Sequence, residues 1–104
     1  MSMRLVFLAR TRADVRWFQH YYDQVFPDGA KRASRHYLAS RQILRENPLI
    51  GRKLEDSEFR EFPIARTPFV FVYRIRGEEI QVLRIWDARG DPDDKLAGRS
   101  SSST

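Results

Sequence analysis

The feature that most constrains the fold is a change of hydrophobic period near the middle of the chain. Between residues 11 and 46 apolar side chains recur at intervals of three and four, the spacing of one helical face. Between residues 58 and 88 three short runs rich in β-branched and aromatic residues are typical of strands. An apolar run at residues 3–9 predicts one earlier strand. The predicted order is β-α-α-β-β-β, an α+β fold with a helical hairpin packed on a sheet.

The first predicted helix begins at Thr11 and ends before Pro27. Thr11 followed three positions later by Asp14 resembles a capping box, in which side chains bind the free N–H groups of the first turn. Proline lacks the N–H that would continue a helix. The apolar face of this helix carries Val15, Phe18, Tyr22 and Val25.

The second predicted helix runs from about Gly29 to Glu46, with Asp28 as its expected N-cap and Asn47-Pro48 as its stop signal. The short link predicts an antiparallel helical hairpin. Its apolar stripe contains Ala30, Ala33, Tyr37 and Leu44, with Leu38 and Ile43 beside it, and its other face carries Lys31, Arg32, Arg35, Arg41 and Arg45.

The strands are predicted at residues 58–64, 68–76 and 80–88, after a loop at 48–57 and with a hairpin turn at 77–79. These three strands predict an antiparallel three-stranded meander, and the N-terminal strand is added to it. Strict alternation in the last run places Ile80, Val82, Arg84 and Trp86 on one face and Gln81, Leu83, Ile85 and Asp87 on the other. Both faces are partly apolar, so we expect the helices to cover one and another segment to cover part of the other.

The length of 104 residues fits one domain, which we assign to residues 1–92, followed by a polar, disordered tail at 93–104. The absence of cysteine excludes disulfides, thiolate catalysis and cysteine metal sites. The two histidines have no ligand pattern and the five glycines are isolated, so neither a metal nor a cofactor is predicted. The apolar runs are too short for a membrane helix, and the composition is compatible with the cytoplasm.

The net charge of +5 is unevenly distributed. Residues 1–54 contain 11 Lys and Arg against 4 Asp and Glu, whereas residues 55–104 contain 8 against 10. An arginine-rich surface suits an acidic protein partner or nucleic acid equally well, or is simply a solvated face. Aromatic residues are concentrated in the apolar stripes, so a stacking platform for bases is not evident.

The end of the last strand carries an acid, a base and a large aromatic side chain. A metal-free ribonuclease would use Arg66, Arg84 and Arg89 to stabilise the transition state and Asp87 as the base. Arginine is a poor proton donor because its pKa is high, and this half of the chain contains no histidine. The role of the acid is therefore unfilled. The alternative is that Asp87 pairs with a nearby arginine. The surplus of large aromatic surface also indicates a protein partner.

Four segments in this order resemble the RelE/ParE superfamily of bacterial toxins. They are NPLIGRKL (47–54), FREFPI (59–64), FVFVYRI (69–75) and IQVLRIWDARGDP (80–92). The resemblance covers roughly residues 3–92. It implies a small cytoplasmic toxin in a hetero-oligomeric complex with a co-encoded antitoxin, which is acidic and partly disordered. Such an antitoxin wraps over the helical hairpin and the sheet edge.

The superfamily implies two different targets. RelE-like members cleave mRNA on the ribosome, whereas ParE-like members inhibit DNA gyrase. Asp87 stands where the resemblance implies a histidine, and IGRKL with the paired strands is similar to the ParE side, so we expect a ParE-type gyrase toxin with a ParD-like antitoxin. The alternatives are a RelE-type mRNA interferase and a non-toxic member that only binds its antitoxin. The expected target-binding residues are Arg84, Trp86, Asp87 and Arg89, and the expected antitoxin-binding residues are Arg12, Arg16, Trp17, Tyr21, Arg35 and Arg41.

Overall fold

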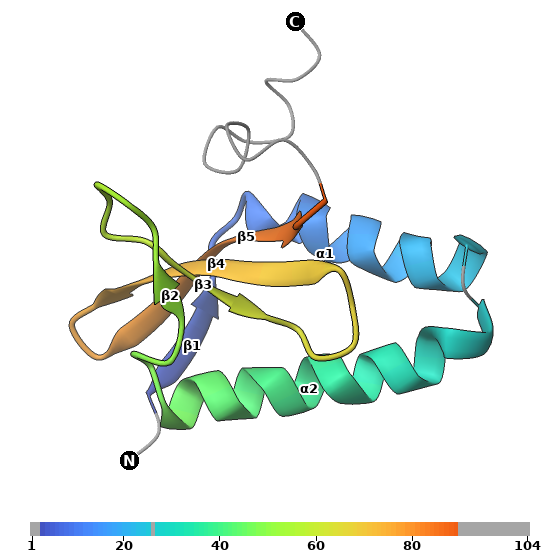
Figure 1. Cartoon of the computed structure of the whole chain (residues 1–104), viewed down its shortest axis with the longest axis horizontal. Helices are drawn as coiled ribbons and strands as arrows, with labels where there is room; N and C mark the ends of the chain where they lie inside the picture. The colour runs from blue at the N-terminus through green and yellow to red at the C-terminus, as the bar shows by residue number, and fades with distance from the viewer. Residues whose placement is uncertain (1–2, 26, 90–104) are drawn as a thin grey trace, which may run out of the picture.

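A computed structural model describes residues 3–25 and 27–89 and confirms the predicted α+β class. Figure 1 shows α1 and α2 joined at one side of the molecule and running in opposite directions, next to a five-stranded sheet. The predicted tail, and the domain boundary at residue 92, lie outside the described residues. The elements are β1 (Arg4–Phe7), α1 (Thr11–His20), a π-helical turn (Tyr21–Val25), a 3₁₀ turn (Pro27–Gly29), α2 (Ala30–Glu46), β2 (Arg52–Lys53), β3 (Arg60–Pro63), β4 (Phe69–Arg76) and β5 (Glu79–Asp87).

The sheet has the order β1-β5-β4-β3-β2, so the first strand lies beside the last. β1 is parallel to β5, and every other pair is antiparallel. The meander of β3, β4 and β5 is as predicted. The predicted loop at residues 48–57 instead contains β2, which has only two residues and therefore no readable period.

A β-bulge in β5 changes which residues share a face. Val72 of β4 pairs with Arg84 while the next residue, Tyr73, pairs with Val82, so Leu83 is an extra residue without a partner position. An extra residue reverses the alternation beyond it. The expectation that Val82 and Arg84 share a face is therefore wrong: Val82 packs in the helix-side core, whereas Leu83 and Trp86 pack on the opposite face.

The main core lies between the helices and the sheet. Phe18 of α1 and Leu44 of α2 pack against the strand residues Phe69 and Phe71, all at most 5% exposed. Each fully buried side chain of this size stabilises the fold by roughly 1.5–3 kcal/mol. A smaller cluster on the opposite face joins strand residues to partly buried neighbours from other segments, as expected; it contains Val70, Val72, Leu83 and Trp86 with Leu8, Leu54 and Phe59.

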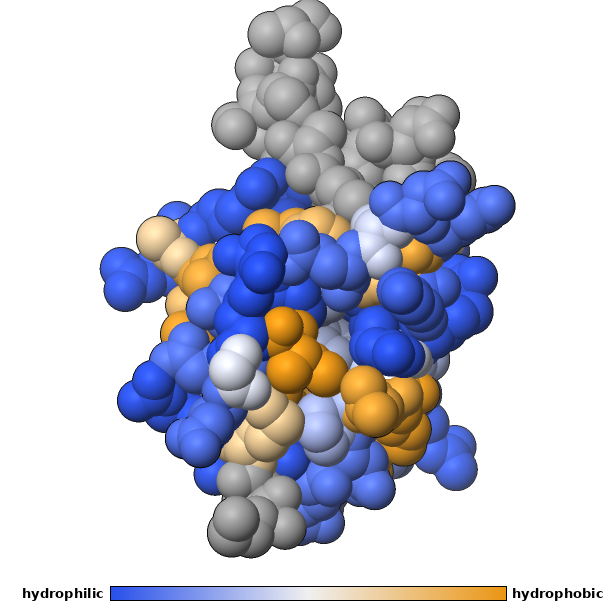
Figure 2. Space-filling view, turned by 90° about the vertical axis from the view of Figure 1, so that its left-hand side faces the viewer, coloured by the Kyte–Doolittle hydropathy of each residue, from blue (hydrophilic) through white to orange (hydrophobic). Residues whose placement is uncertain are grey.

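Some predicted apolar positions remain at the surface. Leu38 and Ile43 of α2 are 58% and 43% exposed, and Leu49 and Ile50 after the helix are also exposed. Figure 2, seen from the side of the β4–β5 turn, shows small hydrophobic patches enclosed by hydrophilic residues. No helix within residues 3–25 and 27–89 has the length and apolar character needed to cross a membrane.

The segment after α2 is fixed by a single buried tyrosine. The Tyr73 hydroxyl donates to the Pro48 carbonyl at 2.7 Å and accepts from the Gly51 N–H at 3.0 Å. A Cβ at position 51 would lie 2.4 Å from the Tyr73 hydroxyl oxygen, so only glycine fits there. This contact gives a packing reason for the glycine of the IGRKL segment.

The predicted helix caps are both wrong. α2 has Gly29 as its N-cap, with no side-chain cap bond, because Asp28 lies in the preceding 3₁₀ turn. α1 has Arg10 as its N-cap, again without a side-chain bond, and ends at His20, with the π-helical turn continuing to Val25. The side chains that resembled a capping box bind elsewhere, as described next.

Candidate partner-binding site

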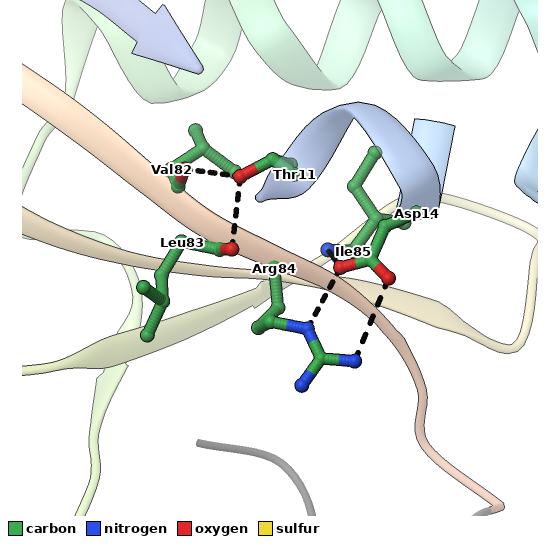
Figure 3. Close-up of polar contacts among 6 residues, drawn as sticks. All are labelled: Thr11, Asp14, Val82, Leu83, Arg84 and Ile85. Carbon is green, nitrogen blue, oxygen red and sulfur yellow. Dashed lines mark hydrogen bonds and ion pairs between the residues drawn. The ribbon is translucent and has the colours of Figure 1, made fainter. Parts of the chain in front are cut away.

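β1 covers only the first part of one edge of β5, and the first turn of α1 binds the part that follows. β1 pairs with β5 only up to Val82. Beyond that point the Thr11 hydroxyl lies 2.7 Å from the Val82 carbonyl and 2.8 Å from the Leu83 carbonyl, to which it donates. The Asp14 carboxylate accepts the Ile85 N–H at 3.1 Å (Figure 3). Thr11 and Asp14 therefore satisfy strand edge groups rather than the helix end, which is why they form no capping box.

Asp14 also forms a buried ion pair with Arg84. The Arg84 Nε donates to Asp14 Oδ2 at 2.8 Å, and both side chains are 1% exposed (Figure 3). The guanidinium lies 4.8 Å from the ring centre of Trp86, which is itself only 8% exposed. In this structure Arg84 and Trp86, two of the expected target-binding residues, thus lie beneath the surface and support the end of the strand.

A second ion pair lies at the surface immediately after β5. Arg89 donates to Asp87 through Nε at 2.9 Å, through Nη2 at 2.7 Å and through its backbone N–H at 2.9 Å. Hydrogen bonds to Asp87 and Tyr21 raise the pKa of Arg89 above its ordinary value. The guanidinium carbon lies 5.9 Å from the Tyr21 ring centre. The strand end therefore presents a fixed cation beside an aromatic ring.

This cation is one wall of an open cleft of about 440 Å³, hereafter the arginine cleft. The cleft brings together residues from four segments that are distant in the sequence. Those with charged or aromatic side chains are Tyr21 and Tyr22 of the π-helical turn, Arg32 and His36 of α2, Arg66 of the β3–β4 loop, and Arg89.

An ordered turn places Arg66 at this cleft. In Figure 1 the loop between β3 and β4 lies beside α2. The buried Ser40 hydroxyl of α2 accepts the Ala65 N–H at 3.2 Å, and the Thr67 hydroxyl donates to the Ile64 carbonyl at 2.9 Å. Arg66 has φ of 59°, a left-handed conformation that is uncommon for a residue other than glycine. The loop is therefore held in one conformation from both sides.

Only part of the cleft was predicted from the sequence. Arg66 and Arg89 were among the candidate ribonuclease residues, whereas Arg32, His36 and Tyr22 were not singled out. The available signal was the i,i+4 spacing of Arg32 and His36, which places them on one helical face. The expectation that aromatic residues do not mix with basic ones is wrong here, because two tyrosines lie among the arginines.

The expected antitoxin-binding residues divide by exposure. Arg12, Arg16 and Arg35 are exposed on the helices. Trp17 and Tyr21 are half-buried, with their rings stacked 5.8 Å apart. Arg41 is also half-buried; its guanidinium carbon lies 5.0 Å from the Phe7 ring centre and 5.6 Å from that of Tyr37. Within the residues that the structure describes, no group of three His, Asp or Glu side chains is placed to hold a metal ion.

Comparisons with known proteins agree on one family. The family model described as the ParE toxin of the type II toxin–antitoxin system parDE matches residues 5–92. A solved structure described as the chromosomal ParDE TA system from P. aeruginosa has 30% sequence identity and a TM-score of 0.64. The match covers 81% of this chain and 94% of that chain. A search of curated proteins found no match.

Proposed function

Since this chain belongs to the ParE family of toxins from type II toxin–antitoxin systems, we propose that it inhibits DNA gyrase by binding to it. In this proposal the toxin stabilises the cleaved-DNA intermediate of gyrase, acts in the cytoplasm and is neutralised by an acidic, partly disordered, ParD-like antitoxin. The family membership supports the antitoxin, and the superfamily resemblance of the sequence supports gyrase as the target.

The main support for a binding mechanism is the set of hydrogen bonds that Asp87 accepts. A general base must accept a proton from the substrate, and its carboxylate must therefore be available. Both carboxylate oxygens of Asp87 accept hydrogen bonds from Arg89, three bonds in all. These bonds hold the carboxylate against Arg89 and occupy most of its acceptor positions. Asp87 thus suits the positioning of Arg89 better than it suits proton transfer.

The proposed contact with gyrase is the exposed end of β5. Arg89 is 60% exposed and is held rigid by Asp87, so it can form a directional contact with little further loss of side-chain entropy. Arg84 and Trp86 lie behind this surface and keep the strand end in place. Tyr21 contributes an aromatic surface beside the cation.

The test is a gyrase supercoiling assay with the purified full-length chain, run in parallel with an mRNA cleavage assay on programmed ribosomes. We expect loss of supercoiling with accumulation of cleaved DNA, and no mRNA cleavage. Arg89→Ala should weaken the inhibition, whereas Arg76→Ala, an exposed arginine at the far end of β4, should not. Cleavage of mRNA with unchanged supercoiling would contradict the proposal.

The antitoxin is proposed to cover the basic surface of the helices. Arg12 and Arg16 lie four positions apart on α1, and Arg35 on α2 adds a third exposed cation. Trp17, Tyr21 and Arg41 add half-buried surface next to them. Opposite charges at such an interface mainly accelerate association. Reversal of the charge in Arg12→Glu with Arg16→Glu should therefore slow association with the antitoxin, measured by surface plasmon resonance. An unchanged association rate would place the antitoxin elsewhere.

RNA cleavage on the ribosome is the second candidate, and one observation favours it. The sequence offered no histidine near the strand end, but the fold places His36 of α2 in the same cleft as Arg66 and Arg89. An imidazole beside two guanidinium groups is a possible acid or base for cleavage. If mRNA is cut, His36→Gln should abolish the cutting; cutting that survives His36→Gln would exclude this role of the histidine.

The third candidate is a member of the family that only binds its antitoxin. Induced expression without antitoxin separates it from the other two. Growth arrest supports a toxin, whereas normal growth at a confirmed protein level supports the antitoxin-binding protein.

A further inference from the structure

The arginine cleft is strongly basic. Its lining, as far as the structure describes it, contains three arginines and one histidine and no carboxylate. Like charges repel, and a concentration of them in a lining without a carboxylate is unfavourable in the absence of a ligand. Asp23 and Asp28 adjoin the wall residues Tyr22 and Gly29 in the sequence, and Asp87 pairs with Arg89, but none of these three acids is among the lining residues that the structure describes. The remaining positive charge is suited to an anion.

The backbone at Arg66 supports a functional reason for this arrangement. A residue other than glycine in the left-handed region costs of order 1 kcal/mol, and such residues cluster at binding sites. Arg66 keeps this conformation because Ser40 and Thr67 fix the two sides of its turn. Asparagine tolerates this conformation better, yet the position carries a guanidinium whose fork of donors matches phosphate oxygens.

The other half of the cleft is aromatic. The rings of Tyr21 and Tyr22 meet edge to face, with centres 5.1 Å apart and an interplanar angle of 77°. Burial raises the pKa of Tyr22 above its ordinary value, so this phenol stays neutral and adds no negative charge to the cleft. Aromatic side chains beside cations are the combination by which proteins hold the bases and phosphates of single strands.

We propose that the arginine cleft binds a nucleoside phosphate, with the phosphate on the arginines and the base against the tyrosines. The volume of about 440 Å³ falls within the range of small-molecule sites and exceeds what a lone carboxylate or inorganic anion fills. The nucleotide is either free or one unit of a single strand, since the chemistry of recognition is the same. The proposal does not depend on gyrase being the target.

The first experiment is isothermal titration calorimetry of the full-length chain with adenosine monophosphate, adenosine and inorganic phosphate. We expect the nucleotide to bind at least about fivefold more tightly than either fragment, because one stacked base contributes about 1–3 kcal/mol. Equal binding of inorganic phosphate would overturn the nucleotide assignment. A short acidic peptide that binds as tightly as the nucleotide would overturn it in favour of a carboxylate site.

The source of the nucleotide is decided by a single-stranded hexanucleotide and its duplex. If the single strand binds more tightly than both the mononucleotide and the duplex, the natural ligand is a single-stranded nucleic acid. If the single strand and the mononucleotide bind equally, the natural ligand is a free nucleotide. Both outcomes support the site. Equal binding of duplex and single strand would overturn it, because a duplex keeps its bases stacked within the helix.

Arg66→Asn is the decisive variant. It removes the guanidinium while suiting the left-handed backbone, so the fold should remain intact. We expect affinity for the nucleotide to fall about tenfold, as for a lost hydrogen bond between charged groups. Arg76→Asn is the matched control, with the same charge change at an exposed position far from the cleft. Equal affinities for the two variants would overturn the proposal, whatever the result of the gyrase assay.

Discussion

Two Asp–Arg ion pairs lie at the end of β5, and they differ strongly in burial. The Arg84–Asp14 pair has a distance of 2.8 Å between Nε and Oδ2, with both side chains 1% exposed. The Arg89–Asp87 pair has a distance of 2.7 Å between Nη2 and Oδ2, with the side chains 60% and 21% exposed. The residue types are the same and the contact lengths are nearly so. Their contributions to stability are expected to differ in size.

Burial decides which pair maintains the fold and which is available for function. Charges removed from water lose their hydration, so each partner of a buried pair depends on the other. An exposed pair is screened by solvent and contributes roughly 0–1 kcal/mol. The inner pair therefore joins α1 to β5, whereas the outer pair only orients Arg89 at the surface.

Asp14→Asn should have the largest effect. It removes the negative charge with which the buried Arg84 pairs, and breaking a buried pair in this way costs about 3–5 kcal/mol. That is a large part of the 5–15 kcal/mol by which domains are usually stable. Urea unfolding followed by tryptophan fluorescence measures the change. The matched control is Asp87→Asn, for which we expect a loss below about 1 kcal/mol. Similar losses for the two variants would contradict the assigned difference between the pairs.

Replacement of the whole inner pair should have a smaller effect than removal of one partner. In the double variant Asp14→Leu with Arg84→Met no charge remains buried, so we expect it to unfold with a free energy about 1–3 kcal/mol above that of Asp14→Asn. It should remain less stable than the original chain, because the Ile85 N–H loses its acceptor. A double variant no more stable than Asp14→Asn would show that the carboxylate matters for the strand edge rather than for Arg84.

The sequence predicted the elements well because their periods are strong. The helical spacing of residues 11–46 and the three β-prone runs place the two helices and β3, β4 and β5 to within a few residues. The details that failed depend on tertiary contacts. Thr11 and Asp14 have the composition of a helix cap, but their side chains meet the open edge of β5. The bulge at Leu83 has no sequence signal that we recognised, and it separates Val82 from Arg84.

From the sequence, only those residues of the candidate site that lie next to strands could be predicted. Arg66, Asp87 and Arg89 stood out because they follow or precede strands, where polar residues interrupt apolar runs. His36 was assigned to a helix and set aside, because it has no metal-ligand pattern and lies outside the half of the chain that holds the strand end. The contact between α2 and the β3–β4 turn depends on the Ser40 hydroxyl, and no local pattern predicts which loop residue a buried serine will bind.

Thr11→Val tests how much the hydroxyl of α1 contributes at the edge of β5. Valine has nearly the same shape but removes the hydroxyl that donates to the Val82 and Leu83 carbonyls. We expect a loss of about 1 kcal/mol in the free energy of unfolding, smaller than that of a buried charge. Urea unfolding measures it, with Ser34→Ala on the exposed side of α2 as the control. A loss as small as that of the control would mean that the hydroxyl bonds contribute nothing to the edge.

Asp87→Ala should have the smallest effect on stability and the clearest effect on function. Its carboxylate accepts two bonds from the Arg89 guanidinium and one from the Arg89 backbone N–H, so its removal leaves the guanidinium less firmly held. Stability should change by less than about 1 kcal/mol. Growth arrest on induction should weaken, because the ordering of the arginine then opposes binding to the target. Undiminished arrest at equal protein level would mean that the order which Asp87 gives to Arg89 does not matter for binding to the target. A weaker arrest with unchanged stability would separate the two pairs by role as well as by burial.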